Sequence, residues 1–493
     1  MHKLNVDSGC KIFPNAYPEW THSTAYTDTF DSILNSNEHL KPGEETSKEF
    51  ACHGRITSVR FNGHFLHIVD NNGKRLQVMF RNTNDKQDSS NDGEGFEAEE
   101  KLARDHLDLN ISTEFGPDKQ KALDLWDIIA VKGTVKKTNT GEITLVAKQA
   151  MLLAKCILPP PDLWHGLKDV ETRYRQRHLD ILVNKDVHNK LLIRSECIHL
   201  IRTYLHKRGH IEVETPILQR FPSGALANPF STKHNAMDME MFLRIAPELY
   251  LKRLIASGFA DKVFEIGKCF RNEGISACHS PEFTMVEIYE KLANMDDMIV
   301  LVENLVQYLV DEMGITIDGK KQIKWKQITM RDLVLEYARI DVYSSSLPDL
   351  ESFCISQNIE VPKNASWGTL VNALFKNKVE PHLILPTHVS YLPLDISPFV
   401  YSNDDSTMPK TARRFESYWM GMEIANGCTE ECDPKKVLKN IKENFQDKDF
   451  INALEYGMPP TAGVGIGIDR LVMVLANAQN IKDVQTFPLL RHT

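Results

Sequence analysis

The chain lacks the segments that would direct it into or across a membrane. No apolar run reaches the ~18 residues that a spanning helix needs. Residues 1–20 show neither a charged stretch followed by an apolar one nor an amphipathic pattern rich in Arg and Ser. We therefore expect no membrane partner and no secretory or transit peptide. The cytoplasm is the expected compartment, and an organelle is left open as the alternative.

Cysteine pairs of the kind that bind zinc are also lacking. The nine cysteines include no C-x-x-C pair and their number is odd, which favours free thiols in a reducing compartment over a disulfide framework. Cys428 and Cys432 are close in sequence, but no second Cys/His pair accompanies them. We expect no zinc site there.

Positive charge is scarce for a protein that would bind nucleic acid. The chain has 58 Lys and Arg against 67 Asp and Glu, a formal net charge of −9. This balance does not exclude nucleic acid, because phosphate contacts need only a local basic patch. Weak basic clusters occur at residues 132–137 and 173–178, and solvated surface is the favoured interpretation of both.

The first part of the chain predicts a small barrel. Residues 1–45 are polar and weakly patterned, and we assign them to an N-terminal extension. Residues 46–158 contain short alternating runs separated by Asn-Gly turns, which predict five strands with a helical stretch among them. Within them, the acidic residues 82–100 predict a disordered insertion. Five strands with one helix fit a Greek-key barrel of the OB type, a fold that often binds single-stranded nucleic acid.

A second domain is predicted for residues 159–493, and residues 156–164, which contain three consecutive prolines, are interpreted as the linker that leads into it. Residues 185–209 have helical periodicity and end at Gly209, whereas residues 210–218 alternate like a strand until Pro216. Many further strands follow with little β-α-β alternation, which favours an α+β fold on a mainly antiparallel sheet. Helices are expected at residues 246–258, 295–313 and 434–446.

Residues 261–291 predict two strands joined by a polar loop. On the second strand, Phe283, Met285, Glu287 and Tyr289 share one face because side chains alternate along a strand. Arg271 at the base of the loop offers a fork for a carboxylate or a phosphate. A surface hairpin with a salt-bridged loop is an equally good interpretation of this stretch alone.

Residues 415–431 predict a hairpin that carries two carboxylates. If Met420 and Gly421 form the turn, Tyr418 pairs with Glu423, and Glu416 lies diagonally beside Glu423. Like charges this close repel unless a cation separates them, and Mg²⁺ bound with substrate phosphates would do so. An exposed acidic hairpin is the alternative, which the apolar and aromatic neighbours make weaker.

Residues 461–478 combine glycines with an apolar helix. Gly463, Gly465 and Gly467 precede Asp469 and Arg470. The pattern is neither the dinucleotide fingerprint nor a P-loop. It would allow close backbone approach to a nucleotide, and Arg470 at the helix start could meet a phosphate.

Three stretches of the chain, in order, resemble the motifs of class II aminoacyl-tRNA synthetases. HIEVETPIL is similar to motif 1, FRNEGISACHSPEFTMVEIY to motif 2 and GVGIGIDRLVMVL to motif 3. Further stretches resemble lysyl-tRNA synthetases in particular, namely RYRQRHLDILVN, ANPFSTKHN, LRIAPELYLKRL and GMPP. The resemblance runs from about residue 50 to the end of the chain and leaves out the acidic insertion.

The resemblance implies a lysine–tRNA ligase. Such enzymes activate L-lysine with ATP to lysyl-adenylate, release diphosphate, and transfer lysine to the 3′ end of tRNA(Lys) with release of AMP. They use Mg²⁺ and form homodimers through motif 1. Their catalytic domain is an antiparallel sheet flanked by helices, and an OB-fold anticodon-binding barrel precedes it.

The resemblance also implies roles for single residues. Catalytic roles fall to Arg271 and Arg470, and Mg²⁺ ligation to Glu416 and Glu423. ATP contacts fall to Arg271, Glu273, His279, Phe283, Glu416, Glu423 and Arg470. Lysine contacts fall to Glu248, Arg271, Glu287, Tyr289, Asn426 and Glu430, and anticodon contacts to Phe65, Gln77 and Glu142. Carboxylates in the amino-acid pocket suit an ammonium, and so disfavour aspartate and asparagine as substrates.

Two other functions compete with this one. A relative that lysylates a protein would lack the barrel, which this chain has. A catalytically silent or altered-specificity homologue that binds tRNA would be expected to lose some of Arg271, Glu416, Glu423 and Arg470, and all four are present.

Three positions depart from the family pattern. Ser223 replaces the first of two glycines, Cys428 replaces an aromatic residue, and Phe399 replaces a leucine. Losing an aromatic wall would weaken lysine binding by roughly 1–3 kcal/mol. We predict that Cys428→Tyr lowers the KM for lysine in steady-state aminoacylation; an unchanged or raised KM would contradict the prediction.

Overall fold

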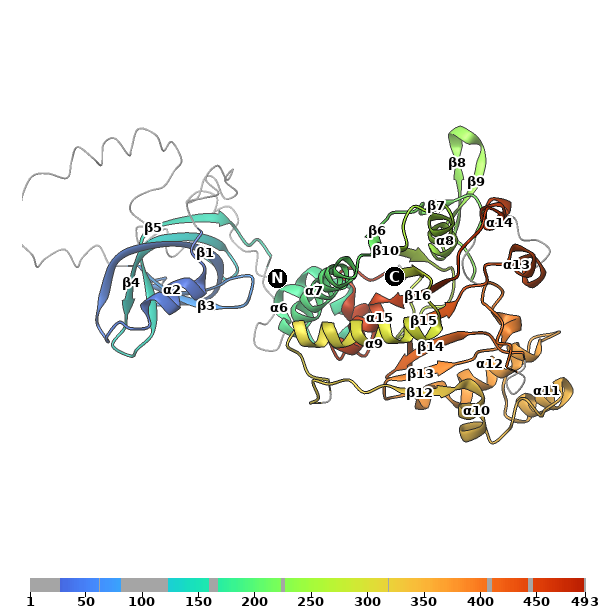
Figure 1. Cartoon of the computed structure of the whole chain (residues 1–493). Helices are drawn as coiled ribbons and strands as arrows, with labels where there is room; N and C mark the ends of the chain where they lie inside the picture. The colour runs from blue at the N-terminus through green and yellow to red at the C-terminus, as the bar shows by residue number, and fades with distance from the viewer. Residues whose placement is uncertain are drawn as a thin grey trace, which may run out of the picture. The chain divides into compact units, whose positions relative to one another are not determined.

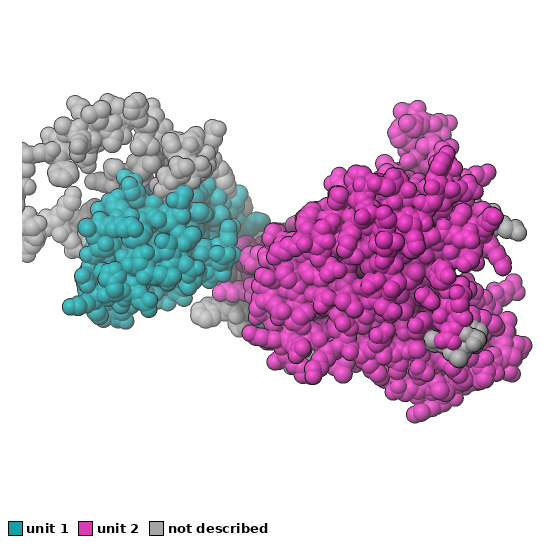
Figure 2. Space-filling view, in the orientation of Figure 1, with its two compact units in different colours: residues 1–168 teal, residues 169–493 magenta. Residues whose placement is uncertain are grey.

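The computed structural model describes residues 27–61, 63–80, 123–158, 167–222, 227–317, 319–405, 410–441 and 447–491. The chain divides into two compact units, Met1–Lys168 and Asp169–Thr493, which Figure 2 colours teal and magenta. Each unit is described by itself below.

The first unit contains a closed barrel of five strands in the order β1-β2-β3-β5-β4 (Figure 1). Its strands are β1 (Glu45–Arg60), β2 (Phe65–Val69), β3 (Arg75–Phe80), β4 (Ile128–Lys137) and β5 (Ile143–Ala154). All neighbouring strands are antiparallel except β3 and β5. Leu66, Ile68, Leu76 and Val78 alternate into the barrel and are buried, so the predicted OB-type barrel is confirmed.

A helix that the sequence analysis missed closes this core. Helix α2 (Phe30–Asn37) begins after Thr29, whose hydroxyl accepts a hydrogen bond from the Ser32 amide at 3.1 Å. Its buried Phe30 and Ile33 pack with the interior residues of the barrel. The helical stretch expected inside the barrel domain and the acidic insertion at 82–100 lie outside the described residues.

The second unit is built on an eight-stranded sheet in the order β12-β13-β14-β15-β16-β11-β10-β6. These strands are β6 (Ile211–Glu212), β10 (Lys262–Phe270), β11 (Glu282–Lys291), β12 (Lys326–Thr329), β13 (Thr387–Ser390), β14 (Arg414–Trp419), β15 (Met422–Thr429) and β16 (Thr461–Gly467). Only the β12–β13 and β6–β10 pairs are parallel. The expected α+β fold on a mainly antiparallel sheet is therefore confirmed.

Three helices cover one face of this sheet. They are α7 (Lys185–Lys207), α9 (Met295–Glu312) and α15 (Ile468–Leu475), which contact one another or the central strands (Figure 1). Buried apolar side chains of all three pack against Val286 and Ile288 of β11. Because residues alternate along a strand, Glu287 and Tyr289 face the other side of the sheet.

The remaining elements flank the sheet and connect its strands. A separate three-stranded sheet consists of β7 (Leu218–Gln219), β9 (Met239–Leu243) and β8 (Ser231–His234). The other helices are α5 (Val170–Arg175), α6 (Arg177–Val183), α8 (Glu248–Ala256), α10 (Met330–Ala338), α11 (Leu347–Ser356), α12 (Trp367–Lys378), α13 (Pro434–Asn440) and α14 (Lys448–Glu455). Among the described residues, none of the helices is both long and apolar enough to cross a membrane.

The predicted element boundaries agree with the structure at some elements and differ at others. Helix α7 ends as expected, with Gly209 in the left-handed region at φ +82° just after it. The strand predicted from residue 210 until Pro216 is shorter than expected, because only Ile211–Glu212 pairs with the large sheet. Pro216 interrupts the run, and Leu218–Gln219 then pairs with the small sheet. Residues 442–446, the end of the third predicted helix, lie outside the described ranges.

Part of the basic cluster at residues 173–178 is buried, which corrects the expectation of a solvated surface. The Arg177 side chain is 2% exposed. It donates to Asp180 at 2.6 Å and to backbone carbonyls of residues 482, 483, 485 and 486 at 2.9–3.2 Å. This single guanidinium therefore ties the C-terminal segment to α6.

We predict that Arg177→Met lowers the free energy of unfolding by about 3 kcal/mol, because several carbonyls and one oxygen of the buried Asp180 lose the donor that Arg177 supplies. Urea unfolding followed by tryptophan fluorescence measures this. Arg175→Met is the matched control: the Glu171 partner of Arg175 is largely exposed, so the expected loss is under about 1 kcal/mol. Equal losses in the two variants would contradict the prediction.

Candidate active site

A large cavity opens on the sheet face opposite α9. Its volume is about 1010 Å³, and it is lined by β11, β14, β15 and β16 together with α8, α12 and the loop after β10. Phe283, Met285, Glu287 and Tyr289 all line it, as the predicted alternation along residues 282–291 requires. A cavity of this size can hold a nucleotide with a small second substrate.

The β14–β15 hairpin places two carboxylates side by side. Trp419 pairs with Met422 and Tyr418 with Glu423, as predicted, across a turn with positive φ at both central residues. The pairing then shifts by one residue, which sets Glu416 opposite Asn426. The Asn426 amide donates to Glu416 at 3.2 Å and to Glu423 at 3.3 Å.

The two carboxylates differ in their surroundings. Burial and then the charge of Glu423 raise the pKa of Glu416. Burial alone would raise the pKa of Glu423, but Arg470, Arg414 and Arg271 together lower it. Glu416 is held by Arg414 at 2.7 Å and by the Tyr418 hydroxyl at 2.6 Å. Each carboxylate thus has an arginine partner, because Glu423 lies 3.6 Å from Arg470. A further cation between the two carboxylates would relieve their mutual repulsion.

Arg470, at the start of α15, joins the hairpin to the loop after β10. Its guanidinium donates to the carbonyls of Glu423 at 2.7 Å and Cys278 at 3.1 Å, and one Nη lies 2.8 Å from His279 Nε2. The preceding Asp469 accepts from the Thr284 amide at 2.6 Å, which fixes α15 against β11. Arg470 is therefore held in place before any ligand binds.

Arg271 has no such partner. Its Nε is buried and makes no hydrogen bond within the described part of the chain, and its guanidinium lies 5.1 Å from the centre of the Phe283 ring. A buried guanidinium N–H without an acceptor favours an anionic ligand. Glu273 and His279 line the same region of the cavity.

The other end of the cavity is acidic. Glu248, Glu287 and Glu430 line it, and the Tyr289 hydroxyl donates to Glu287 at 3.2 Å. Burial first, and then the charge of Glu248, raise the pKa of Glu287 to about 8. Burial likewise raises the pKa of Glu430 to about 7, although Lys252 opposes the shift. An ammonium group would stabilise these carboxylates in their charged form.

Glycines of β16 make room for this acidic end. A Cβ on Gly463 would lie 2.3 Å from the Tyr289 ring and 2.9 Å from Glu430, and one on Gly465 would lie 2.9 Å from Met285. From the sequence, these glycines are expected to let a nucleotide lie close to the backbone. What the structure describes is that they leave room for the side chains of Tyr289 and Met285 on β11, which line the cavity.

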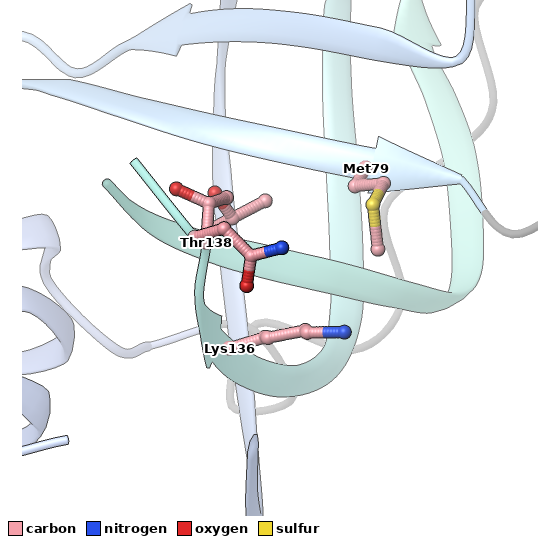
Figure 3. Close-up of a pocket in the computed structure, with 5 residues that line it drawn as sticks. Met79, Lys136 and Thr138 are labelled. Atoms are coloured by element: carbon pink, nitrogen blue, oxygen red, sulfur yellow. The ribbon is translucent and has the colours of Figure 1, made fainter. Parts of the chain in front are cut away.

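The barrel residues predicted to contact an anticodon share one outer face. The Thr144 hydroxyl donates to Gln77 at 2.6 Å, and His67, directly opposite Gln77, lies 3.3 Å from Glu142. Phe65, on the same strand and face as His67, is opposite Met79. Beside Met79 and Thr144 a pocket of about 190 Å³ is completed by Lys136, Thr138 and Asn139 (Figure 3).

Comparison with known proteins agrees with this geometry. Residues 169–491 match the family model described as tRNA synthetases class II (D, K and N). This chain belongs to the class II tRNA synthetases. The match spans the second unit, which contains the large sheet and its cavity.

Curated relatives extend the match over the barrel as well. A lysine–tRNA ligase of Fervidobacterium nodosum is 39% identical over 97% of this chain and 91% of its own length. One of Mannheimia succiniciproducens is 43% identical over 97% and 94%. One of Bacillus subtilis is 44% identical over 75% and 78%.

One buried residue of this synthetase was missed by sequence reasoning. Lys252 on α8 lies 2.5 Å from both Glu248 and Glu430. The available signal was its place one helical turn after Glu248 on an otherwise apolar helix face. Asn426, expected beside the lysine side chain, instead bonds with Glu416 and Glu423.

Two of the three departures from the family pattern, Cys428 and Phe399, lie at the acidic end of the cavity. The Cys428 thiol donates to Glu430 at 3.3 Å. The Phe399 ring lies 5.4 Å from the Lys252 ammonium. Ser223 lies outside the described residues.

We predict that Cys278 is the most reactive of the eight described cysteines. A hydrogen bond with His279, 3.3 Å away, lowers the pKa of its thiol to about 7 despite partial burial, whereas burial raises the pKa of the other seven. Iodoacetamide labelling at pH 7.5, read by peptide mass spectrometry, should modify Cys278 first.

The same labelling should slow about tenfold per pH unit below that pKa, as the thiolate disappears. Cys278→Ser removes the fast-reacting site and is the control. Faster labelling of any other described cysteine would refute the prediction.

Proposed function

We propose that this chain is a lysine–tRNA ligase, which activates L-lysine with ATP and transfers it to the 3′ end of tRNA(Lys). The observation that carries the proposal is the cavity with unlike ends. One end has three glutamates suited to ammonium groups, of which Glu287 and Glu430 are buried and Glu248 is partly exposed. The other end has arginines suited to phosphates. The curated relatives, all lysine–tRNA ligases, support the same function.

Lysine would bind at the acidic end. Glu248 would receive the α-ammonium, and Glu287 and Glu430 the side-chain ammonium, with Tyr289 orienting Glu287 through its hydroxyl. Arg271 would pair with the substrate carboxylate. A neutral side chain of the same length would leave one negative charge at this end unpaired, so it would be rejected strongly.

ATP would bind at the arginine end. Phe283, whose ring already faces Arg271, would stack on adenine, with Glu273 near its edge. Arg271 would meet the α-phosphate, and His279 and Arg470 the distal phosphates. Because Arg470 is already held by backbone carbonyls, little side-chain freedom is lost when the phosphates arrive.

The Glu416–Glu423 pair fits Mg²⁺. Two adjacent carboxylates, one buried at Glu416 and one partly exposed at Glu423, are the donors that a hard divalent ion prefers. Among the described residues there is no group of three or more metal-binding side chains, so phosphate oxygens and water would complete the ligand set. When bound, the ion would neutralise charge on the phosphates.

The reaction then needs no covalent intermediate with the protein. A lysine carboxylate oxygen attacks the α-phosphorus in line, the bond to the bridging oxygen breaks, and diphosphate leaves. The terminal ribose hydroxyl of tRNA next attacks the carbonyl carbon, and AMP leaves. Arg271 would stabilise the charge that develops at the α-phosphate, and the acidic end would hold lysine in line.

The barrel and the assembly complete the proposal. Phe65, Gln77 and Glu142 would bind the anticodon on the outer face of β2, β3 and β5. We keep the assignment of residues 46–158 to the anticodon-binding domain and 159–493 to the catalytic domain. Of residues 1–45, assigned to an extension, helix α2 packs into the barrel core and is placed with the barrel. A homodimer through the motif 1 region and a cytoplasmic location are also proposed.

Transfer of radiolabelled lysine to total tRNA, with ATP and Mg²⁺, tests the function. We expect charging with lysine, and its loss when the metal is chelated. Glu416→Gln should lower kcat by about 10- to 100-fold, because one metal-binding carboxylate is lost. The matched control is Glu336→Gln, which changes an exposed glutamate of α10. A folded protein that charges no lysine would refute the proposal and favour a silent or altered-specificity homologue.

A further inference from the structure

Lys252 is a buried cation that none of the steps above uses. Its side chain is 2% exposed, and its ammonium lies 2.5 Å from Glu248 Oε1 and 2.5 Å from Glu430 Oε2. The two glutamates come from separate elements, since Glu248 begins α8 and Glu430 directly follows β15. One ammonium therefore links the two.

Lys252 lies behind the cavity and not inside it. Glu248 and Glu430 both line the cavity, whereas Lys252 does not. The second oxygen of Glu430 lies near Cys428 and the Tyr289 ring, which do line it. The lysine thus holds both carboxylates from the rear and leaves their cavity side available to a substrate.

The charges at this end are unbalanced without Lys252. Three carboxylates, those of Glu248, Glu287 and Glu430, share one buried space. Beyond burial, Glu248 raises the pKa of both other glutamates, and Lys252 lowers both. The other titratable or charged groups that act on these three residues are Tyr289, Cys428, Cys432, Cys269 and Arg271.

We propose that Lys252 is a positioning residue for amino-acid recognition, which orients the Glu248 and Glu430 carboxylates and supplies a positive charge between them before the substrate arrives. This inference rests on the proposed function. It also accounts for the selectivity by charge: three carboxylates less one lysine leave two negative charges, which the α- and ε-ammonium groups of lysine neutralise. A neutral amino acid would leave one of them unpaired.

The test compares Lys252→Met with Lys252→Arg, measuring the KM for lysine and for ATP between pH 6.5 and 9.5. Lys252 lowers the pKa of Glu287 and Glu430. Loss of its positive charge makes these two glutamates harder to ionise, so Lys252→Met should raise the KM for lysine at pH 7 by roughly tenfold or more. The KM should recover as the pH rises toward 9. Lys252→Arg keeps the charge and should keep the wild-type pH profile, and the KM for ATP should change less than about twofold in both variants.

Two further variants separate positioning from packing. Lys262→Met removes a lysine from the buried Glu290, which does not line the cavity, and should leave the pH profile for lysine unchanged. In a Glu430→Gln background, Lys252→Met should cost less than it does alone, because the two residues act through one contact. Lys252→Gln, neutral and polar, replaces the Met variant if that one does not fold.

Each negative result has a separate meaning. A wild-type protein that neither binds nor charges lysine refutes the proposed function, and this inference with it. A wild-type protein that charges lysine, together with a neutral Lys252 variant whose KM for lysine rises equally at every pH, refutes this inference alone. An unchanged KM in the neutral variant refutes it as well.

Discussion

Buried carboxylates on one face of the eight-stranded sheet require compensating cations, and this requirement organises the whole cavity. Glu416, Glu287 and Glu430 are all less than a tenth exposed. Each would be unstable as an isolated charge in such a place. Arg414 compensates Glu416, and Lys252 compensates Glu430. Glu287 has a hydroxyl for a partner but no directly bonded cation among the described residues, which leaves a place for a cationic substrate.

The alternation of β11 makes this polar face possible without loss of the core. Val286 and Ile288 belong to the same apolar cluster as the buried residues of α9. Glu287 and Tyr289, the residues that alternate with them along the strand, line the cavity. The same strand therefore anchors the fold and shapes the site. The glycines of β16 leave the space that this arrangement needs, since a side chain at Gly463 would displace Tyr289 and one at Gly465 would displace Met285.

Local pattern was enough to predict what depends on strand alternation and turn geometry. The shared face of Phe283, Glu287 and Tyr289 and the pairing of Tyr418 with Glu423 needed only period two and a two-residue turn. What depends on contacts between distant segments was not visible. The burial of Arg177 requires carbonyls some 300 residues away, and the place of α2 requires the barrel interior. The role of Lys252 requires Glu430, which a charge on one helix face cannot reveal.

The cations of the cavity divide into two kinds, and the division bears on how its two ends act together. Arg414 and Arg470 are bound by protein groups on several sides, so they are rigid features of the site. The Nε of Arg271 has no hydrogen-bond partner among the residues that the structure describes, yet Arg271 lowers the pKa of both Glu287 and Glu423. It is therefore within electrostatic reach of both the acidic end and the arginine end. A carboxylate and a phosphate that both met this guanidinium would be brought together, which is the geometry that an in-line attack at phosphorus demands.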